Sequence, residues 1–111
     1  MNRTKELDSI KENFNELLNS SDENQKFRTH YEAVYDNGII DPKTKRLIAL
    51  CGGIIAGCKG CILGQADHAI KNGATTEEIM EVCSIALSLG GTLAGSQISL
   101  LMEYLKERKL L

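Results

Sequence analysis

Apolar residues recur along the chain at helical spacing, and no stretch shows the strict alternation of apolar and polar residues that marks a strand. Leu7, Ile10 and Phe14, for example, form a stripe with spacings of three and four residues. Clusters of Asn, Ser, Asp and Gly separate the apolar segments. The pattern predicts an all-α bundle of about six helices, over residues of roughly 4–18, 22–35, 42–57, 58–73, 76–89 and 93–109.

Local signals support these boundaries. Three helix starts carry capping patterns: Ser20 with Glu23, Asp41 with Pro42, and Thr75 with Glu78. Gly90-Gly91 is expected to separate the last two helices. The nearly uninterrupted apolar run over residues 47–56 predicts a central helix, surrounded on most sides. Gly52-Gly53 within it costs about 1 kcal/mol of helix propensity per residue, which indicates that another helix passes close by.

The 111 residues are expected to form one domain spanning the whole chain, 1–111. A net charge of −2 with mixed signs, and only 5% aromatic residues, exclude a basic or stacking surface for nucleic acid. No apolar run reaches the roughly 18 residues of a membrane span, and the charged start lacks the apolar segment of a signal peptide. We therefore expect a cytoplasmic protein that binds neither nucleic acid nor membranes.

Cys58 and Cys61 stand three residues apart between two apolar helical runs. In the reducing cytosol, such a pair is more often catalytic or metal-binding than structural. If Cys58 begins a helix, Cys61 lies one turn further on the same face, with the Cβ atoms roughly 5–6 Å apart. A small adjustment brings the two sulfurs into disulfide range. A bond that closes so short a loop stabilises the fold little and suits reversible thiol–disulfide exchange.

The pair needs activation, because a free cysteine with a pKa of about 8.5 is only about 3% thiolate at pH 7. A helix N-terminus lowers that pKa by less than about one unit. Further help would come from positive charge or from a base that takes the proton. The candidates are Lys59, Arg46 and His68, the last of which lies two helical turns beyond Cys61 on the same face.

Two other interpretations of the pair stay open. A tetrahedral zinc site needs two more ligands, and the chain has no second CxxC and no spaced His pair. Cys51 and Cys83 lie in apolar runs and fit small buried residues. A non-catalytic metal or iron–sulfur protein would therefore need CxxC pairs from several subunits around an oligomer axis. The third interpretation is a structural bundle in which the pair has no chemistry.

Four elements carry a resemblance to a known family: DPKTK at residues 41–45, GCKGCI at 57–62, NGATTEEIMEV at 72–82, and Gly90-Gly91. In this order and spacing they resemble the core of the carboxymuconolactone decarboxylase and alkylhydroperoxidase D superfamily, over about residues 39–95. The resemblance implies an all-helical fold that assembles into homo-oligomers, commonly trimers or hexamers. For members with CxxC it implies an antioxidant peroxidase or disulfide reductase.

The resemblance also implies roles for the two cysteines. In these peroxidases the second cysteine attacks the peroxide and becomes a sulfenic acid, and the first condenses with it to a disulfide. An external dithiol partner then reduces the disulfide. Carried onto this chain, Cys61 would be the peroxidatic residue and Cys58 the resolving one. The step requires no metal, flavin or haem cofactor.

Two positions depart from the peroxidase pattern. The peroxidases carry a histidine four residues after the second cysteine and a glutamate twelve residues before the first, and this chain has Gln65 and Arg46. Glutamine cannot accept a proton, whereas an arginine can stabilise a thiolate electrostatically. The replacements favour disulfide exchange, which needs no dedicated proton relay. We therefore expect a thiol oxidoreductase with catalytic Cys58 and Cys61. Its candidate tuning residues are Gln65, His68, Arg46 and Lys59.

Overall fold

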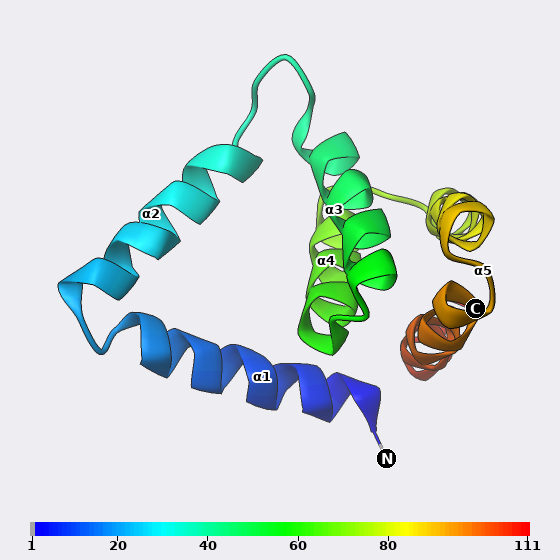
Figure 1. Cartoon of the computed structure of the whole chain (residues 1–111), viewed down its shortest axis with the longest axis horizontal. Coiled ribbons are helices and arrows are strands. Elements are labelled where there is room, and N and C mark those ends of the chain that lie inside the picture. Colours follow the sequence, from blue (N-terminus) through cyan, green and yellow to red (C-terminus); the bar gives the residue numbers. More distant parts are fainter. Residues whose placement is uncertain (1) are drawn as a thin grey trace.

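The computed structural model describes residues 2–111, which form helices joined by short loops. The helices are α1 (Arg3–Leu18), α2 (Asp22–Tyr35), α3 (Pro42–Ala56), α4 (Lys59–Lys71) and α5 (Thr76–Glu107). Residues 2–111 contain no strand, so the all-α prediction is confirmed. In Figure 1, α3 and α4 lie against each other in the middle. α1 and α2 form a V on one side of this pair, and α5 lies on the other side.

The expected six helices become five because the last two are merged into α5. Gly91 within α5 has non-helical backbone angles, with φ 58° and ψ −139°. A Cβ placed on Gly95 would lie 3.8 Å from Cδ1 of Leu87, whereas eight residues of straight helix span about 12 Å. The chain therefore folds back at Gly91, and Figure 1 shows two separate halves of α5. The break lies where the sequence predicts it, without a loop.

By length and composition alone, α5 is the one helix of residues 2–111 that could cross a membrane. A single helix of this kind is weak evidence for a membrane span. The reversal at Gly91 also divides α5 into halves that are each shorter than the roughly 20 residues that a spanning helix needs.

The helix starts follow the predicted caps with one exception. The starts at residues 41–42 and 75–78 are confirmed, and the latter is a complete capping box. The prediction at Ser20 is one residue early. Ser21 caps α2 by accepting the backbone N–H of Asn24, whereas the Ser20 hydroxyl donates to a carbonyl at the end of α1.

The most enclosed helix is α4 and not α3. The fully buried residues of α4 are Ile62, Leu63, Ala66 and Ala69. On α3, Ile54 packs into the core, but Ile48 and Ile55 are 57% and 47% exposed. The prediction that α3 is surrounded on most sides is therefore wrong. Its outer face borders an apolar groove shared with α5, because an unbroken apolar run does not say which of its faces the fold covers.

The close approach of α3 and α4 depends on Gly53. A Cβ at this position would lie 3.0 Å from Cβ of Cys61 and 3.3 Å from backbone atoms of the same turn. Only glycine leaves room for the first turn of α4 there. A Cβ placed on Gly52 would meet no atom of another element within 4 Å, so the predicted close contact holds for one of the two glycines. Gly53 thereby fixes Cys61 against α3.

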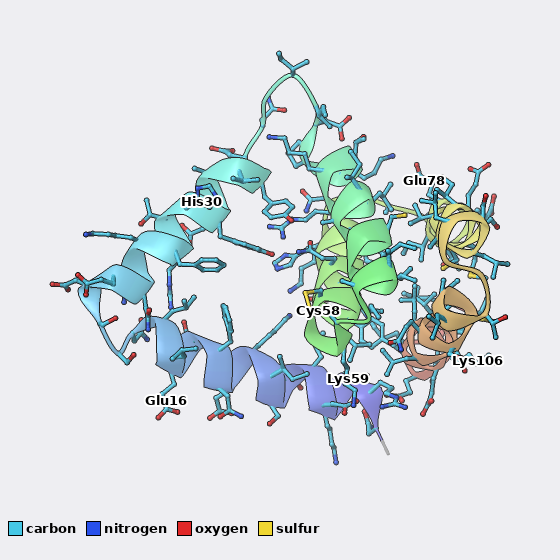
Figure 2. The ribbon with its side chains drawn as sticks, in the orientation of Figure 1. Glu16, His30, Cys58, Lys59, Glu78 and Lys106 are labelled. Atoms are coloured by element: carbon cyan, nitrogen blue, oxygen red, sulfur yellow. A yellow bond between two sulfur atoms is a disulfide. The ribbon has the colours of Figure 1, made fainter. Side chains whose placement is uncertain are left out.

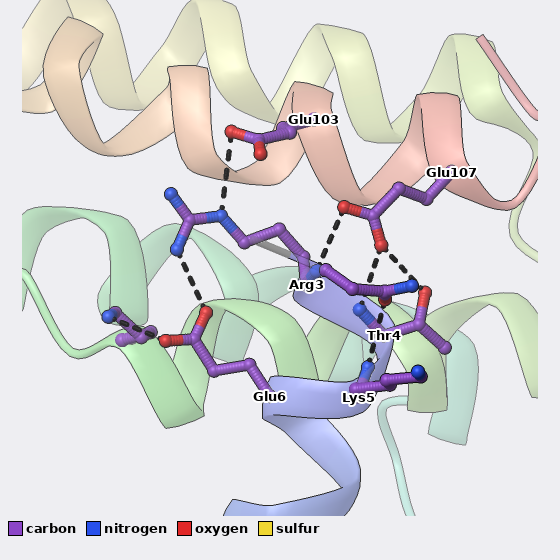
Figure 3. Close-up of polar contacts among 8 residues, drawn as sticks. Arg3, Thr4, Lys5, Glu6, Glu103 and Glu107 are labelled. Atoms are coloured by element: carbon purple, nitrogen blue, oxygen red, sulfur yellow. Dashed lines mark hydrogen bonds and ion pairs between the residues drawn. The ribbon is translucent and has the colours of Figure 1, made fainter.

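Polar contacts fasten the start of α1 to α5 and α4, as Figure 3 shows. Glu107 near the end of α5 accepts the backbone N–H of Arg3 at 2.8 Å. Glu6 pairs with both Arg3 and Lys59, at 2.8 Å each. Because Lys59 is the first residue of α4, these contacts hold α1 beside the helix start where the cysteine pair lies.

The far end of α1 and the whole of α2 contribute little to the core. Leu7 is the one buried residue of α1, and α2 has none. Phe14 and Leu17 on α1 are 46% and 54% exposed, and Phe27 on α2 is 50% exposed. Several apolar side chains of these two helices instead line a cavity in front of α4.

Candidate functional site

Cys58 and Cys61 form a disulfide at the start of α4, with their Cα atoms 5.2 Å apart. The chain enters this turn through Gly57, whose φ of 66° is left-handed and suits glycine. Cys58 then becomes the N-cap of α4, and its Sγ accepts the Cys61 backbone N–H at 3.2 Å. Cys61 is exposed and Cys58 half-buried. The predicted helix start and the placement of both cysteines on one turn are confirmed.

The disulfide borders a half-open cavity of about 620 Å³ that is lined by residues of α1, α2 and α4 and by Arg46 of α3, and that we call the cysteine cavity. Figure 2 shows Cys58 on the side of α4 that faces α1 and α2. The volume is within the range typical of small-molecule sites. The apolar side chains that line it are Leu7, Ile10, Phe14, Leu18 and Phe27. The predicted site residues that line it are Cys58, Cys61, Arg46, Gln65 and His68.

Arg46 and Gln65, the two residues that depart from the peroxidase pattern, contact each other. The Arg46 guanidinium donates from Nη1 to Oε1 of Gln65 at 3.1 Å and to the Tyr31 hydroxyl at 2.7 Å. Nε2 of Gln65 donates to the same hydroxyl at 3.0 Å. The guanidinium carbon also lies 3.8 Å from the ring centre of Tyr35, in cation–π contact. Arg46 and Gln65 are buried, at 9% and 8% exposed, and the two tyrosines that contact Arg46 are half-buried.

His68 is half-buried on α4 and lines the cysteine cavity. Burial, together with the positive charges of Arg46 and Lys11, lowers the pKa of His68 below its usual value. Its imidazole is therefore uncharged near neutral pH and has a free lone pair for a proton. His68 is the one group among the predicted tuning residues that can act as a base in this cavity.

Lys59 lies outside the cysteine cavity, although it is next to Cys58 in the sequence. Its ammonium points to α1 and pairs with Glu6. The structure thus places Arg46, Gln65 and His68 around the same cavity as the cysteine pair. Lys59 is not part of this group.

Tyr31 and Tyr35 belong to the site, although no sequence motif marks them. With Phe27 they recur every four residues on α2, which places the three rings on one helix face. The rings contact one another in sequence, with centroids 6.3 Å and 4.7 Å apart. Burial and the neighbouring Tyr31 raise the pKa of Tyr35, so its hydroxyl stays neutral. The four-residue aromatic repeat is the signal that could have pointed to this row of rings on α2.

Asp67 is a second buried charge, one residue before His68, and is 6% exposed. Its carboxylate pairs with Lys11 at 2.6 Å, Lys71 at 2.9 Å and Arg108 at 3.1 Å. Burial by itself raises the pKa of Asp67, but the hydrogen bonds and charges of Lys11 and Lys71 outweigh it and lower the pKa to about 2. Asp67 thereby ties α1 and the end of α5 to α4.

In the part of the chain described, no three His, Cys, Asp or Glu side chains gather where they could hold a metal ion. Cys83 is buried, as expected, and burial and the nearby Cys51 raise its pKa to about 11. Cys51 is half-buried and borders the groove between α3 and α5, so it is less enclosed than expected. A metal at the cysteine pair would need ligands from another subunit.

The chain is similar to two uncharacterized bacterial proteins. It is 36% identical over 58 residues to protein 4 of the cox locus of Paracoccus denitrificans, and this match covers 52% of each chain. It is 31% identical over 65 residues to a protein of Cupriavidus necator, and this match covers 59% of this chain and 58% of the other. The chain spans about half the length of the curated relatives it matches.

Solved structures resemble nearly the whole chain. A carboxymuconolactone decarboxylase family protein of Thermotoga maritima, for which a role in the antioxidative response has been suggested, has a TM-score of 0.84 and 28% identity. The match covers 94% of this chain and 90% of that one. A protein of the same family from Legionella pneumophila has a TM-score of 0.68 and 27% identity, covering 94% of this chain and 88% of that one.

The family profile described as "Carboxymuconolactone decarboxylase family" matches residues 22–101. The match extends on both sides of the region, about 39–95, in which the sequence motifs lie. It takes in α2 with its aromatic face, all of α3 and α4, and most of α5. The chain therefore belongs to the carboxymuconolactone decarboxylase family.

Proposed function

We propose that this chain is a thiol-dependent oxidoreductase that cycles Cys58 and Cys61 between a disulfide and a dithiol. It reduces a small disulfide or peroxide in cytoplasmic redox metabolism and receives electrons from an external dithiol. The observation that carries the proposal is the disulfide at the start of α4, bordering the cysteine cavity. The antioxidative role suggested for the Thermotoga maritima protein supports it.

In the reductive half of the cycle, a donor thiolate attacks the sulfur of the exposed Cys61. The Cys58–Cys61 bond breaks, and Cys58 leaves as a thiolate. The Cys61 N–H and the positive end of α4 stabilise that thiolate, and a thiol with a lower pKa leaves faster. The second donor thiol then displaces Cys61. The donor becomes a disulfide, and its two protons end on the two cysteines.

In the oxidative half, the Cys61 thiolate attacks the substrate. A disulfide substrate forms a mixed disulfide with Cys61 and releases one thiolate, and Cys58 then displaces the second. An alkyl peroxide leaves an alcohol, hydrogen peroxide leaves water, and in both cases Cys61 becomes a sulfenic acid, which condenses with Cys58 and releases water. His68 lines the same cavity about 10 Å along α4 from Cys61 and is uncharged near neutral pH, so it would take the thiol proton through intervening water and return it to the leaving group by the same path.

The contacts of Arg46 favour disulfides over peroxides as substrates. Arg46 and Gln65 bond to each other at the two positions where the peroxidases carry their proton relay, and neither side chain accepts a proton from a thiol. His68 remains as the base, one turn further along α4. Exchange needs an accessible thiolate and a resolving thiol, and both are present without a relay.

Single-turnover kinetics test the proposal. The reduced protein is mixed with a small disulfide or with hydrogen peroxide, and the thiols are followed by mass after alkylation. We expect Cys61→Ser to abolish turnover. Cys58→Ser should stop after one step, with a mixed disulfide on Cys61 after the disulfide probe and a Cys61 sulfenic acid after hydrogen peroxide. Cys51→Ser, outside the cysteine cavity, is the matched control and should keep wild-type rates. Full turnover in Cys61→Ser would contradict the proposal.

We also propose that the protein acts as a homo-oligomer, a trimer or hexamer, and that the groove between α3 and α5 is the contact surface. This groove has a volume of about 510 Å³, and its lining is almost entirely apolar. Ile48, Ile85 and Leu89 within it are 57%, 54% and 74% exposed. A continuous apolar surface of this kind marks an interaction site on a soluble protein.

Light scattering tests the oligomer. The wild-type protein should have a mass of three or six chains, and Ile85→Glu should reduce it to one chain. Ile39→Glu, an exposed apolar residue outside the groove, is the control and should leave the mass unchanged. A monomeric wild-type protein would refute this assembly.

A further inference from the structure

We propose that the cysteine cavity is a carboxylate-binding site in which Arg46 holds the head group, and that the substrate is a small disulfide bearing a carboxylate on a short apolar chain. The disulfide part of this inference rests on the proposed function. The carboxylate part does not, because it follows from the charge and the contacts of Arg46.

The charge of Arg46 has no counter-ion. Across residues 2–111, no carboxylate oxygen lies within 4.0 Å of its guanidinium. Its contacts are instead a hydroxyl, an amide oxygen and an aromatic ring, which are all neutral. Burying a charge without a partner is costly, and folds avoid it away from functional sites. A residue that is 9% exposed and unpaired is therefore a candidate for binding an anion.

One edge of the guanidinium is available for that anion. Both hydrogen bonds of Arg46 leave from Nη1. Nε and Nη2, which form the opposite edge, bond to no atom of residues 2–111, and neither is sealed from solvent. Arg46 lines the cysteine cavity, so this edge has an approach. Two parallel N–H groups match the two oxygens of a carboxylate, and Tyr31 and Gln65 hold the guanidinium in place for them.

The other residues of the cavity define the rest of the ligand. Of the two further cations that line it, Lys11 pairs with Asp67, and Arg28 donates to Asn15 at 2.7 Å. Arg46 is the buried cation of this lining, and its Nε–Nη2 edge bonds to no atom of residues 2–111. Apolar side chains of α1 and of Phe27 form much of the remaining lining, and Asn15 and the exposed Glu32 also border it. This combination suits an apolar chain that ends in one carboxylate.

The spacing between Arg46 and the cysteines sets the position of the reacting bond. Gln65 bonds to Arg46 and lies four residues after Cys61 on α4, which is about 6 Å along the helix axis. A carboxylate at Arg46 and a sulfur at Cys61 are thus a few carbon atoms apart. Cys61 attacks the substrate disulfide and one substrate thiolate leaves. Cys58 then releases the other, and the two cysteine protons end on the two product thiols.

Calorimetry on the oxidised protein tests the carboxylate site without any redox step. The probes are octanoate and octanol, which share an apolar chain. We expect octanoate to bind at least tenfold more tightly, and Arg46→Gln to remove that preference while leaving octanol binding unchanged. Tenfold corresponds to about 1.4 kcal/mol. Arg28→Gln is the matched control, because it removes another cavity arginine and should keep the preference.

Equal binding of the two probes to the wild-type protein would overturn the inference, and so would an Arg46→Gln variant that keeps the preference. The wild-type comparison decides the matter even if this variant fails to fold. Arg46→Lys keeps the positive charge but loses the two parallel N–H donors, so it should retain only part of the preference for octanoate over octanol.

Turnover separates this inference from the proposed function. The probes are the mixed disulfide of mercaptopropionic acid with butanethiol and the corresponding amide. If wild type turns over the acid faster than the amide and Arg46→Gln does not, both proposals are supported. Equal turnover of acid and amide supports the redox function and overturns the inference. Octanoate binding through Arg46 with turnover of neither probe supports the carboxylate site and overturns the redox function.

Discussion

Asp67 and Arg46 are both buried charged residues that contact the cavity-facing helices, yet their surroundings are opposite. The Asp67 carboxylate has three cationic partners from α1, α4 and the end of α5. The Arg46 guanidinium has none of opposite sign within residues 2–111 and rests on a tyrosine hydroxyl, a glutamine amide and a ring. Side chains of the protein neutralise the charge of Asp67, whereas the charge of Arg46 has no neutralising partner among residues 2–111.

The difference teaches how to separate structural charges from functional ones. A paired buried charge contributes stability only while its partners are present, and removing one partner leaves the others uncompensated. An unpaired buried charge costs stability, so a fold retains it where function needs it. Asp67 therefore holds helices together, whereas Arg46 is placed to bind a ligand in the cysteine cavity. Four predictions test this division, from the largest expected effect to the smallest.

Asp67→Asn should lower the free energy of unfolding by about 2–4 kcal/mol, because it leaves Lys11, Lys71 and Arg108 without their shared anion. Urea unfolding followed by circular dichroism measures the change. Asp8→Asn, an exposed acid on the same α1 helix as Lys11, is the control and should change little. If both variants unfolded at the wild-type urea concentration, Asp67 would not be a structural charge.

Acid should remove the same contribution. The pKa of Asp67 is lowered from 3.8 to about 2 in the folded protein, so its stabilisation is present above about pH 4 and is lost as the pH falls through about 2. At about 1.36 kcal/mol per pKa unit, the loss is about 2 kcal/mol. Urea midpoints measured across this range should fall more steeply for wild type than for Asp67→Asn. Parallel curves would be the contrary result.

Tyr31→Phe should lower the free energy of unfolding by about 1–2 kcal/mol. It removes the hydroxyl that accepts from Arg46 and from Gln65, and leaves buried donors without an acceptor. Urea unfolding measures the loss, and in an Arg46→Gln background the loss should be smaller. An equal loss in both backgrounds would show that the hydroxyl does not act through Arg46.

Arg46→Gln should change the free energy of unfolding by less than about 1 kcal/mol, because the lost hydrogen bonds are offset by the removal of an unpaired buried charge. Octanoate should raise the melting temperature of wild type more than that of this variant, since a ligand stabilises the folded state in proportion to how tightly it binds. Thermal scans with and without octanoate provide both values. A loss as large as that of Asp67→Asn would make Arg46 a structural charge.

The features that the sequence predicted correctly are local ones. The caps at residues 41–42 and 75–78, the break at Gly90-Gly91 and the placement of Cys58 and Cys61 on one turn depend on neighbours within a few positions. The error at Ser20 was also local, because two adjacent serines offer the same cap and the backbone uses the second.

The cysteine cavity could not be predicted, because it depends on contacts between distant parts of the chain. Gln65 meets Arg46 across 19 residues and Tyr31 across 34. The family pattern marked both Gln65 and Arg46 as departures but did not show that they bond to each other. The enclosure of α3 was overestimated for a related reason, since its apolar outer face remains open beside α5.

A redox titration of the Cys58–Cys61 couple tests the central claim most directly. The protein is equilibrated with a graded series of dithiothreitol under argon, the free thiols are alkylated, and the mass shift is read together with the metal content. We predict a cooperative two-electron midpoint between roughly −120 and −270 mV, the range of known thiol oxidoreductases. A pair that never forms a disulfide, or that is purified with stoichiometric zinc or an iron–sulfur cluster, would contradict the account and favour a metal carrier.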